Sequence, residues 1–420
     1  MKIKIKHNLF VVALSVLLCL PVSHAKAQTP SLTIHQIGLA DGDAALYVII
    51  DTTVGNLFAP SRWDTTTILL DAQREYCYME LYDYVDSILN KVLHRKKLDY
   101  AVLSHVHIDH YGSMKSTIEH LRATGYTVGN VIDRFNSVSP QIGWSLDDID
   151  TCYDYINAPA STSNAASRYR YYMQANNNNT GGNPGSFRWY PLYVFDNLIQ
   201  AKNLTNFSMI CLSANGRSAN GTGGVSTFIP QMPYNPGYYK PRSENDLSYS
   251  FLLTFGSFHY FTSGDLGGGG GNYSNGETPI AQYFRRTYPG NHICAFKTGH
   301  HGSAHSTNDS LVRLMNPTLA VVPAALRSYS GTQLPTNTAI SKLRAANDSI
   351  RYTFIPSNPG ANVNSWNLAY LQDVVLSITD VPRAGANIPM NVSLRRRDRT
   401  TRELDGTIVN QVITCTKTHY

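Results

Sequence analysis

The stretch Ser104-His105-Val106-His107-Ile108-Asp109-His110 holds three imidazoles and one carboxylate. It directly follows Tyr100-Ala101-Val102-Leu103, whose apolar character is typical of a short buried strand. Neutral imidazole is a favoured nitrogen ligand for zinc and related ions, and a carboxylate supplies a hard oxygen ligand. A single histidine is more often a satisfied core residue than a ligand. Four potential ligands crowded at the end of one strand instead predict a metal site.

The spacing of these four residues suits two cations better than one. Alternation along an extended chain places His105 and His107 on the same side, where both can face a first metal ion. The turn that follows can bring Asp109 and His110 toward a second ion a few ångströms away. We therefore expect two divalent metal ions. Zinc is the first choice, and manganese and iron accept the same ligands.

A further candidate ligand ends another apolar strand, in Phe261-Thr262-Ser263-Gly264-Asp265-Leu266. An aspartate that occurs alone at such a position is more often a turn residue. Beside the histidine motif, Asp265 is well placed to bridge two cations, and we predict that role for it. The five glycines from Gly267 to Gly271 indicate a mobile loop next to the site or a surface excursion.

The third candidate segment is Lys297-Thr298-Gly299-His300-His301-Gly302-Ser303, which follows the apolar residues 293–296. We expect His300 to complete the second metal. His301 could then donate a proton to a leaving group or hold an anionic oxygen. Lys297 and Ser303 could assist with an anion or could be structural. The candidate catalytic residues are therefore Asp109, His301 and Lys297.

The first 27 residues have the features of a signal peptide. Three lysines precede the apolar run Leu9–Leu20, and Ala25-Lys26-Ala27 predicts cleavage before Gln28. A lipoprotein signal is the alternative, but Leu18 precedes Cys19 where a small residue is expected. The apolar run is too short to span a bilayer, and no later segment approaches the needed length. We expect a periplasmic or secreted protein whose mature chain has no membrane span.

Composition narrows the class of protein and of partner. The 420 residues include 35 Lys and Arg and 29 Asp and Glu, a net charge of +6 with neutral histidines. Cleavage removes four lysines and leaves 31 basic against 29 acidic groups, a net charge of +2. A net charge so close to neutral does not indicate a protein that wraps nucleic acid or one that binds an anionic membrane surface. A hydrophobic content of 42% excludes general disorder.

The cysteines do not form a metal motif. Five remain after cleavage, and none belongs to a C-x-x-C pair: Cys77, Cys152, Cys211, Cys294 and Cys415. We expect buried single thiols, with one or two disulfides permitted by an oxidising compartment.

The order of segments predicts a layered α/β domain. Strands are expected over 32–37, 44–50, 67–71 and 100–103, and helices over 75–94 and 113–123. A long insertion follows over about 130–245, because Gly, Ser and Asn interrupt the apolar pattern there. Strands return at 248–255, 258–263, 293–297 and 319–322, and a helix is expected over 337–346. The last part, 356–420, is expected to be a β-rich extension, so the main domain is expected to span 28–355.

Two features outside the motifs leave alternatives open. The insertion is rich in rings, which could line a substrate cleft or could attach the insertion to the core. These rings are Tyr153, Tyr155, Tyr169, Tyr171, Tyr172, Phe187, Trp189, Tyr190 and Tyr193. The basic run Arg395-Arg396-Arg397 could be a solvated hairpin face or a phosphate-binding strip.

The order H-x-H-x-D-H, strand-Gly-Asp, Lys-x-x-His-His-Gly-Ser resembles the metallo-β-lactamase superfamily. Within it, the chain is similar to the hydrolase domain of ComEC-type DNA-uptake proteins and their free-standing relatives. The segments 38–44 (GLADGDA) and 243–248 (SENDLS) resemble further motifs of that group, and the likeness spans about residues 31–350.

The resemblance implies an αββα sandwich with a dinuclear metal site at one edge. Carried over to this chain, His105 and His107 hold the first metal, Asp109 and His110 hold the second, and Asp265 bridges them.

Two departures from the resemblance concern histidines. Many superfamily members place a first-metal histidine between these motifs, but none lies between His120 and His259. His120 is expected on a helix surface and His259 in the core. Asn245 or Asp246 could take the missing role. The ComEC-type group also carries a His-Pro pair after the last strand, where this chain has Leu334-Pro335.

Three functions are compatible with these residues. The first is a secreted hydrolase in which a hydroxide shared by two metals attacks a phosphodiester, either nucleic acid or a phosphorylated envelope component. The second uses the same chemistry on a lactone, lactam or other acyl substrate. The third is a metal- or ligand-binding protein that has kept the fold and lost turnover.

Overall fold

The computed structural model describes residues 29–39, 42–51, 64–134, 165–177, 186–198, 206–231, 241–324, 328–329, 332–345, 352–354, 372–379, 381–383, 385–397 and 404–416. The expected signal peptide lies outside the described residues, and so do Cys152, Tyr153 and Tyr155.

A first sheet has nine strands among the described residues, in the order β21-β20-β19-β1-β2-β3-β4-β5-β6. Their bounds are β1 (Ser31–Gln36), β2 (Ala45–Asp51), β3 (Asp64–Leu70), β4 (Lys97–Val102), β5 (Thr127–Ile132), β6 (Arg188–Tyr190), β19 (Gln372–Thr379), β20 (Ile388–Arg397) and β21 (Leu404–Cys415). The strands from β3 to β6 run parallel, and the other pairings are antiparallel.

A second sheet has eight described strands, in the order β18-β15-β14-β11-β10-β7-β8-β9. Their bounds are β7 (Phe207–Ala214), β8 (Arg217–Ala219), β9 (Val225–Thr227), β10 (Ser250–Phe255), β11 (Phe258–Thr262), β14 (Ala295–Lys297), β15 (Leu319–Val321) and β18 (Tyr352–Phe354). β11, β14, β15 and β18 run parallel. Two hairpins stand apart: β12 (Gly268–Gly270) with β13 (Tyr273–Asn275), and β16 (Ser328–Tyr329) with β17 (Thr332–Gln333).

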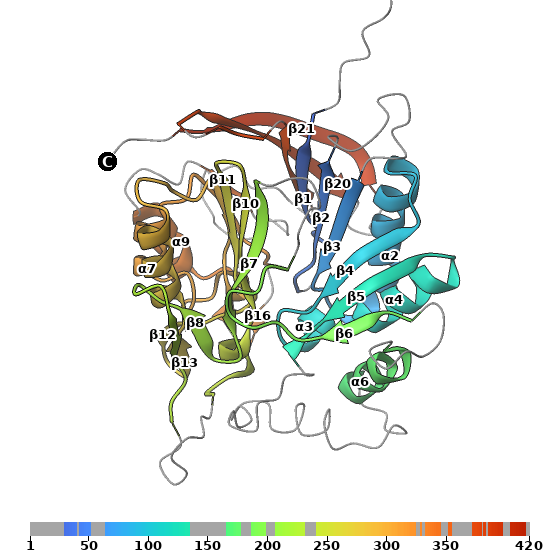
Figure 1. Ribbon diagram of the computed structural model, residues 1–420, viewed down its shortest axis with the longest axis horizontal. Helices are drawn as coiled ribbons and strands as arrows, with labels where there is room; N and C mark the ends of the chain where they lie inside the picture. The colour runs from blue at the N-terminus through green and yellow to red at the C-terminus, as the bar shows by residue number, and fades with distance from the viewer. Residues whose placement is uncertain are drawn as a thin grey trace, which may run out of the picture.

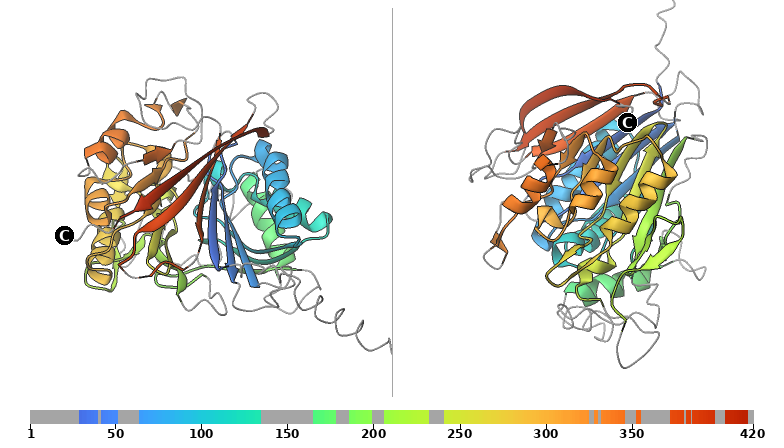
Figure 2. Two further views of the ribbon diagram at one scale, coloured as in Figure 1. Left: turned by 90° about the horizontal axis from the view of Figure 1, so that it is seen from above. Right: turned by 90° about the vertical axis from the view of Figure 1, so that its left-hand side faces the viewer.

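The two sheets pack face to face, and helices cover their outer faces (Figure 1, Figure 2). α2 (Tyr78–Asp86), α4 (Met114–Ala123) and α6 (Ala165–Asn176) share an apolar cluster with the first sheet. α7 (Glu277–Thr287), α8 (Asp309–Met315) and α9 (Asn337–Ala345) share another with the second sheet. A third cluster lies between the sheets and takes residues from both. The expected four-layer αββα sandwich is confirmed.

Strands in the middle of this sandwich are apolar on both faces. In β2, Tyr47 and Ile49 point into the cluster between the sheets, whereas Leu46 and Val48 point toward the helices. The ring of Tyr47 meets that of Tyr260 on β11, with ring centroids 6.1 Å apart. Because successive side chains of a strand alternate between faces, a strand buried on both sides has a continuous apolar run.

The described parts of the expected insertion, 130–245, belong to the sheets. β5 and β6 extend the first sheet, and β7 to β9 form one edge of the second. Its described rings mainly attach this region to the core. Tyr169 is buried and its hydroxyl donates to Asp133, and Trp189 is buried in the same cluster. In the described parts of this region, Gly, Ser and Asn therefore mark loops between sheet strands.

The β-rich C-terminal extension continues the first sheet, since β19 pairs with β1 along six residues. Figure 1 shows β20 and β21 at one end of the sandwich, above the strands of both sheets. A disulfide between Cys294 and Cys415 joins the end of β21 to the residue before β14. The extension is thus tied to both sheets rather than forming a separate domain.

Among the described residues, no helix is both long enough and apolar enough to cross a lipid bilayer.

The Cys294–Cys415 disulfide closes a loop with a sequence separation of 121 residues. Replacing both cysteines by serine is expected to lower the free energy of unfolding by about 2–4 kcal/mol, because the unfolded chain gains freedom. Urea unfolding followed by circular dichroism measures this loss. Wild-type protein reduced with dithiothreitol should unfold at the variant's midpoint. An unchanged midpoint in both samples would show that the link contributes nothing.

Candidate metal centre

The candidate ligands lie where parallel strands of both sheets end. β3 and β4 are parallel, and Asp71 and His105 follow their carboxyl ends closely. β11 and β14 are parallel in the second sheet, and Asp265 and His301 follow theirs. Because carboxyl ends of parallel strands meet at one edge, residues distant in sequence converge there.

The H-x-H-x-D-H segment turns from β4 into a short helix, α3 (Ile108–Tyr111). His107 is in extended conformation at the N-cap of α3, and its Nδ1 lies 3.0 Å from Nε2 of His105. Asp109 and His110 lie within α3 and are buried. As expected from alternation along the chain, His105 and His107 face the same point.

Asp265 stands between imidazoles from both sheets. Its Oδ2 lies 3.3 Å from Nε2 of His110, 3.4 Å from Nε2 of His301 and 3.8 Å from Nε2 of His105. Nε2 of His301 is also 3.2 Å from Oδ2 of Asp109. Among the groups of ligand atoms that lie within 4.8 Å of one another and could hold a metal ion, two contain Asp265 or Asp109 with these imidazoles: His105, His110 and Asp265, and Asp109, His110 and His301.

Hydrogen bonds behind the centre orient two of these rings. Nδ1 of His110 lies 2.9 Å from Oδ2 of Asp71, and Nδ1 of His301 lies 2.6 Å from the carbonyl oxygen of Pro323. Both partners are acceptors, so each Nδ1 carries the proton. In the neutral rings, the Nε2 lone pairs therefore point into the centre, as metal ligation requires.

His105 is oriented through a serine. The hydroxyl of Ser104 donates to Asp71, at 2.7 Å, and lies 3.1 Å from Nδ1 of His105. Since the hydroxyl proton is used on Asp71, Ser104 accepts the proton of His105 Nδ1, and Nε2 of His105 is left as a ligand. Asp71 thus orients two rings.

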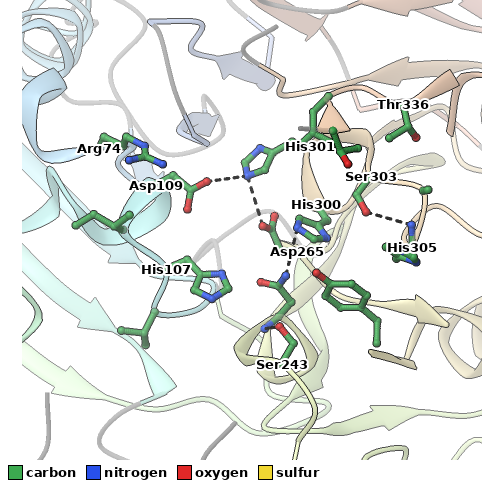
Figure 3. Close-up of a pocket in the computed structure, with 17 residues that line it drawn as sticks. Arg74, His107, Asp109, Ser243, Asp265, His300, His301, Ser303, His305 and Thr336 are labelled. Atoms are coloured by element: carbon green, nitrogen blue, oxygen red, sulfur yellow. Dashed lines mark hydrogen bonds and ion pairs between the residues drawn. The ribbon is translucent and has the colours of Figure 1, made fainter. Parts of the chain in front are cut away.

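The structure places His301, and not His300, among the carboxylates of the centre. Nε2 of His301 lies among the carboxylates, whereas Nε2 of His300 lies 3.3 Å from Nδ2 of Asn245. Figure 3 shows both rings, with His301 joined by dashed lines to Asp109 and Asp265. Both residues have positive φ, 45° and 50°. His301 is therefore better placed than His300 to act as a ligand, and His300 forms part of the pocket wall.

Lys297 does not face the pocket, contrary to expectation. Its side chain is 1% exposed and forms an ion pair with Asp43. Asp43 also accepts from Gln36 Nε2 at 2.7 Å, and its backbone N–H donates to the carbonyl of Asp109 at 3.1 Å. Lys297 therefore acts as a structural residue that joins the two sheets behind the centre.

Gly42 is required beside this ion pair. It has a φ of +95°, and a Cβ there would lie 1.9 Å from the carbonyl oxygen of Asp109. Only glycine allows this approach, which fixes the backbone that presents Asp109.

Of the two candidates for the missing histidine, Asn245 lies at the pocket and Asp246 does not. Asp246 accepts from the backbone N–H of Ser274 at 3.0 Å and so supports the β13 hairpin. Both candidates lie in η5 (Glu244–Leu247). Asn245 is 2% exposed, and among the described residues its Oδ1 has no hydrogen-bond partner. It can therefore offer an amide oxygen as a ligand.

The centre forms one wall of a pocket of about 500 Å³. His107, Asp109, Asp265 and His301 line it, and Arg74 is the single Lys or Arg among its described lining residues. Leu334 also lines it, so an apolar side chain stands where the ComEC-type group has histidine. His259 is buried against Phe284, as expected for a core residue.

Without a cation, this centre holds protons instead. Burial opposes a charge on His110, but the carboxylates of Asp265 and Asp71 outweigh it and raise its pKa to about 10. Burial alone would raise the pKa of Asp265, yet the positive charges on His110 and His301 hold it well below its ordinary value. The carboxylates thus demand positive charge, which protons or metal ions can supply.

The four layers and the position of the centre, at the strand edge shared by both sheets, decide the fold. The chain has the metallo-β-lactamase fold. A crystal structure of the metallo-β-lactamase fold protein YhfI from Bacillus subtilis is similar at 10% sequence identity and a TM-score of 0.38, over 77% of this chain and 96% of that one. A scan of family models and a search of curated proteins found no match.

Sequence reasoning missed several residues around the centre. Asp71 follows an apolar strand in the same way as Asp265, and that position was a usable signal. Arg74, Tyr273 and His305 line the pocket, and no local pattern marks them.

The orienting role of Asp71 can be tested with Asp71→Asn. Oδ1 of Asp71 accepts from the backbone N–H of Ser104, and Oδ2 accepts from the Ser104 hydroxyl and from His110. An amide replaces one of these oxygens by an NH2 group, which cannot accept, so zinc affinity is expected to fall about 10–100-fold. Competition with a chromophoric chelator measures the affinity. Asp99→Asn is the matched control, because Asp99 is a buried carboxylate of the same sheet that pairs with Arg95. Equal affinities in both variants would contradict the role.

Proposed function

We propose that the protein is a hydrolase that binds two divalent cations at this centre and cleaves a phosphodiester. The observation that carries the proposal is the convergence of six ligand residues from both sheets. They are His105, His107, Asp109, His110, Asp265 and His301.

The donor set fits divalent cations on physical grounds. Nε2 of His110 lies 3.3 Å from Nε2 of His301, and the Nδ1 atoms of both rings are already bonded to acceptors. In neutral rings this brings two lone pairs together, which is repulsive unless a cation or proton lies between them. Oδ1 of Asp265 is buried and has no hydrogen-bond partner among the described residues. An unsatisfied carboxylate oxygen in such a place is costly unless it binds an ion.

The ligands divide into two sets. His105 and His107, with the amide oxygen of Asn245, would hold the first cation. Asp109, His110 and His301 would hold the second, and Asp265 would be shared. Zinc is the ion this imidazole and carboxylate set favours, and manganese and iron are compatible with it. When bound, such ions supply an activated water and neutralise charge on the substrate oxygens.

The residues around the ligands position the substrate. Asp71, Ser104 and the Asp43–Lys297 pair hold the ligands in place, so the centre is organised before substrate binds. Burial lowers the pKa of His300 to about 4, so its ring is neutral at pH 7. The ring therefore lines the pocket without carrying a second proton.

The pocket favours an anionic substrate. Arg74 supplies a guanidinium next to Asp109, as Figure 3 shows, and bound cations would add further positive charge. A phosphodiester matches this field better than a neutral lactone or lactam. The signal peptide expected over residues 1–27 supports a periplasmic or secreted location. Nucleic-acid fragments or phosphorylated envelope components would then be the available substrates.

Hydrolysis of bis(p-nitrophenyl) phosphate by the purified mature protein, loaded with zinc or manganese, tests the proposal. Turnover is expected, and Asp265→Asn should lower kcat/KM about 100-fold or more, because the shared ligand loses its charge. Asp99→Asn is again the matched control and should keep wild-type activity.

The other functions give different results in the same assay. Turnover of p-nitrophenyl acetate without turnover of the phosphodiester would replace the phosphodiester by an acyl substrate. Loaded protein that turns over neither compound would instead be a binding protein.

A further inference from the structure

Two features of the pocket lie on opposite sides of the metal centre and are not among its six candidate ligands. One is Arg74. The other is the ring pair Tyr273 and His305, which we call the ring shelf. Figure 3 shows Arg74 beside Asp109 and His305 on the other side, with the ligands between them. All three residues line the pocket.

The backbone that presents Arg74 is held firmly. Its carbonyl accepts from the backbone N–H of Cys77, at 2.9 Å, and from the hydroxyl of Ser113. The preceding Gln73 donates from Nε2 to the carbonyl of Ile37 at 2.8 Å. The fixed backbone places the guanidinium next to the ligands, at the pocket. Its planar fork matches two oxygens of a phosphoryl group.

The ring shelf is built by the glycine run. The rings of Tyr273 and His305 stack, with centroids 5.0 Å apart and planes inclined by 28°. A Cβ on Gly271 would lie 3.0 Å from Cε1 of His305, so the absence of side chains lets the hairpin lie against that ring. The backbone N–H of Gly268 donates to the carbonyl of His305 at 2.7 Å.

The loop that carries His305 is fixed from its other side as well. The backbone N–H of His305 donates to the hydroxyl of Ser303 at 3.1 Å, and Lys342 donates to the carbonyl of Ala304 at 2.8 Å. The five glycines expected to be a mobile loop or a surface excursion thus form, with this loop, a packed wall of the pocket.

We propose that the pocket binds phosphate esters of aromatic groups in one orientation. Arg74 contacts a phosphoryl oxygen on one side, and the ring of the ester lies on the shelf of Tyr273 and His305 on the other. The inference rests on the proposed function and adds the class of the organic group. An aryl or nucleoside ring fits, since stacking on such side chains is tolerant of ring type.

Calorimetric titration of zinc-loaded protein with three monoesters tests this without turnover. The ligands are phenyl phosphate, cyclohexyl phosphate and methyl phosphate. Phenyl phosphate is expected to bind about fivefold more tightly than cyclohexyl phosphate, which has a similar size but no π face. Thymidine 5′-phosphate in a further titration distinguishes nucleosides from simple aryl groups.

Variants separate the two subsites. His305→Ala should remove the preference for phenyl over cyclohexyl phosphate and leave methyl phosphate unchanged. His120→Ala is the matched control, because His120 contacts Tyr82 on the far side of the first sheet. Arg74→Ala should lower the affinity for all three monoesters about tenfold, and Arg74→Lys should lower it less. Arg313→Ala is the matched control: Arg313 is an exposed arginine of α8, and its loss should leave all three affinities unchanged.

The outcomes distinguish this inference from the proposed function. Binding of all monoesters with equal affinity, or a phenyl preference that survives in His305→Ala, would overturn the ring shelf. Unchanged affinities in Arg74→Ala would overturn the anion subsite. Failure of every phosphate ester to bind the loaded protein would instead contradict the proposed phosphodiester function.

Discussion

The structure depends on one buried carboxylate that meets imidazoles from both sheets. Oδ2 of Asp265 lies within 3.4 Å of His110, which follows the first sheet, and of His301, which follows the second. Like His105, His110 and His301, it is almost completely buried. Isolated charges of this kind are unstable in a protein interior, so the arrangement requires positive charge between the groups. The face-to-face packing of two sheets is what brings these residues to one place.

The convergence of these residues requires unfavourable backbone conformations around the centre. Four residues at or next to the centre have positive φ although none is glycine: Asp71, Gln73, His300 and His301. Such residues cost of order 1 kcal/mol each, and they persist where the rest of the fold determines their conformation. Here that support comes from the Asp43–Lys297 ion pair and from backbone hydrogen bonds such as Ala72 N–H to the carbonyl of His110, at 2.7 Å.

Much of the fold and the centre could be predicted from sequence, because the signals are local. The apolar run in β2 and the histidines after β4 are contiguous patterns. The roles of His300 and His301 could not be predicted, since two adjacent histidines differ only in which one meets Pro323 and which one meets Asn245. The ion pair of Lys297 could not be predicted either, because its partner Asp43 is distant in sequence.

The strands between 130 and 245 were also difficult to predict from the sequence. β6 has three residues and β8 and β9 have three each, so an alternating pattern cannot develop in them. Their place in the sheets depends on pairing with distant strands. The pocket residues Arg74, Tyr273 and His305 likewise come together only through the tertiary fold.

The central claim is that six residues form a dinuclear metal site: His105, His107, Asp109, His110, Asp265 and His301. The most direct test is the metal content of the purified mature protein, measured by inductively coupled plasma mass spectrometry after dialysis against metal-free buffer. The account predicts about two divalent ions per chain. A chain that folds normally and retains no metal, even after incubation with zinc, manganese or iron, would contradict it.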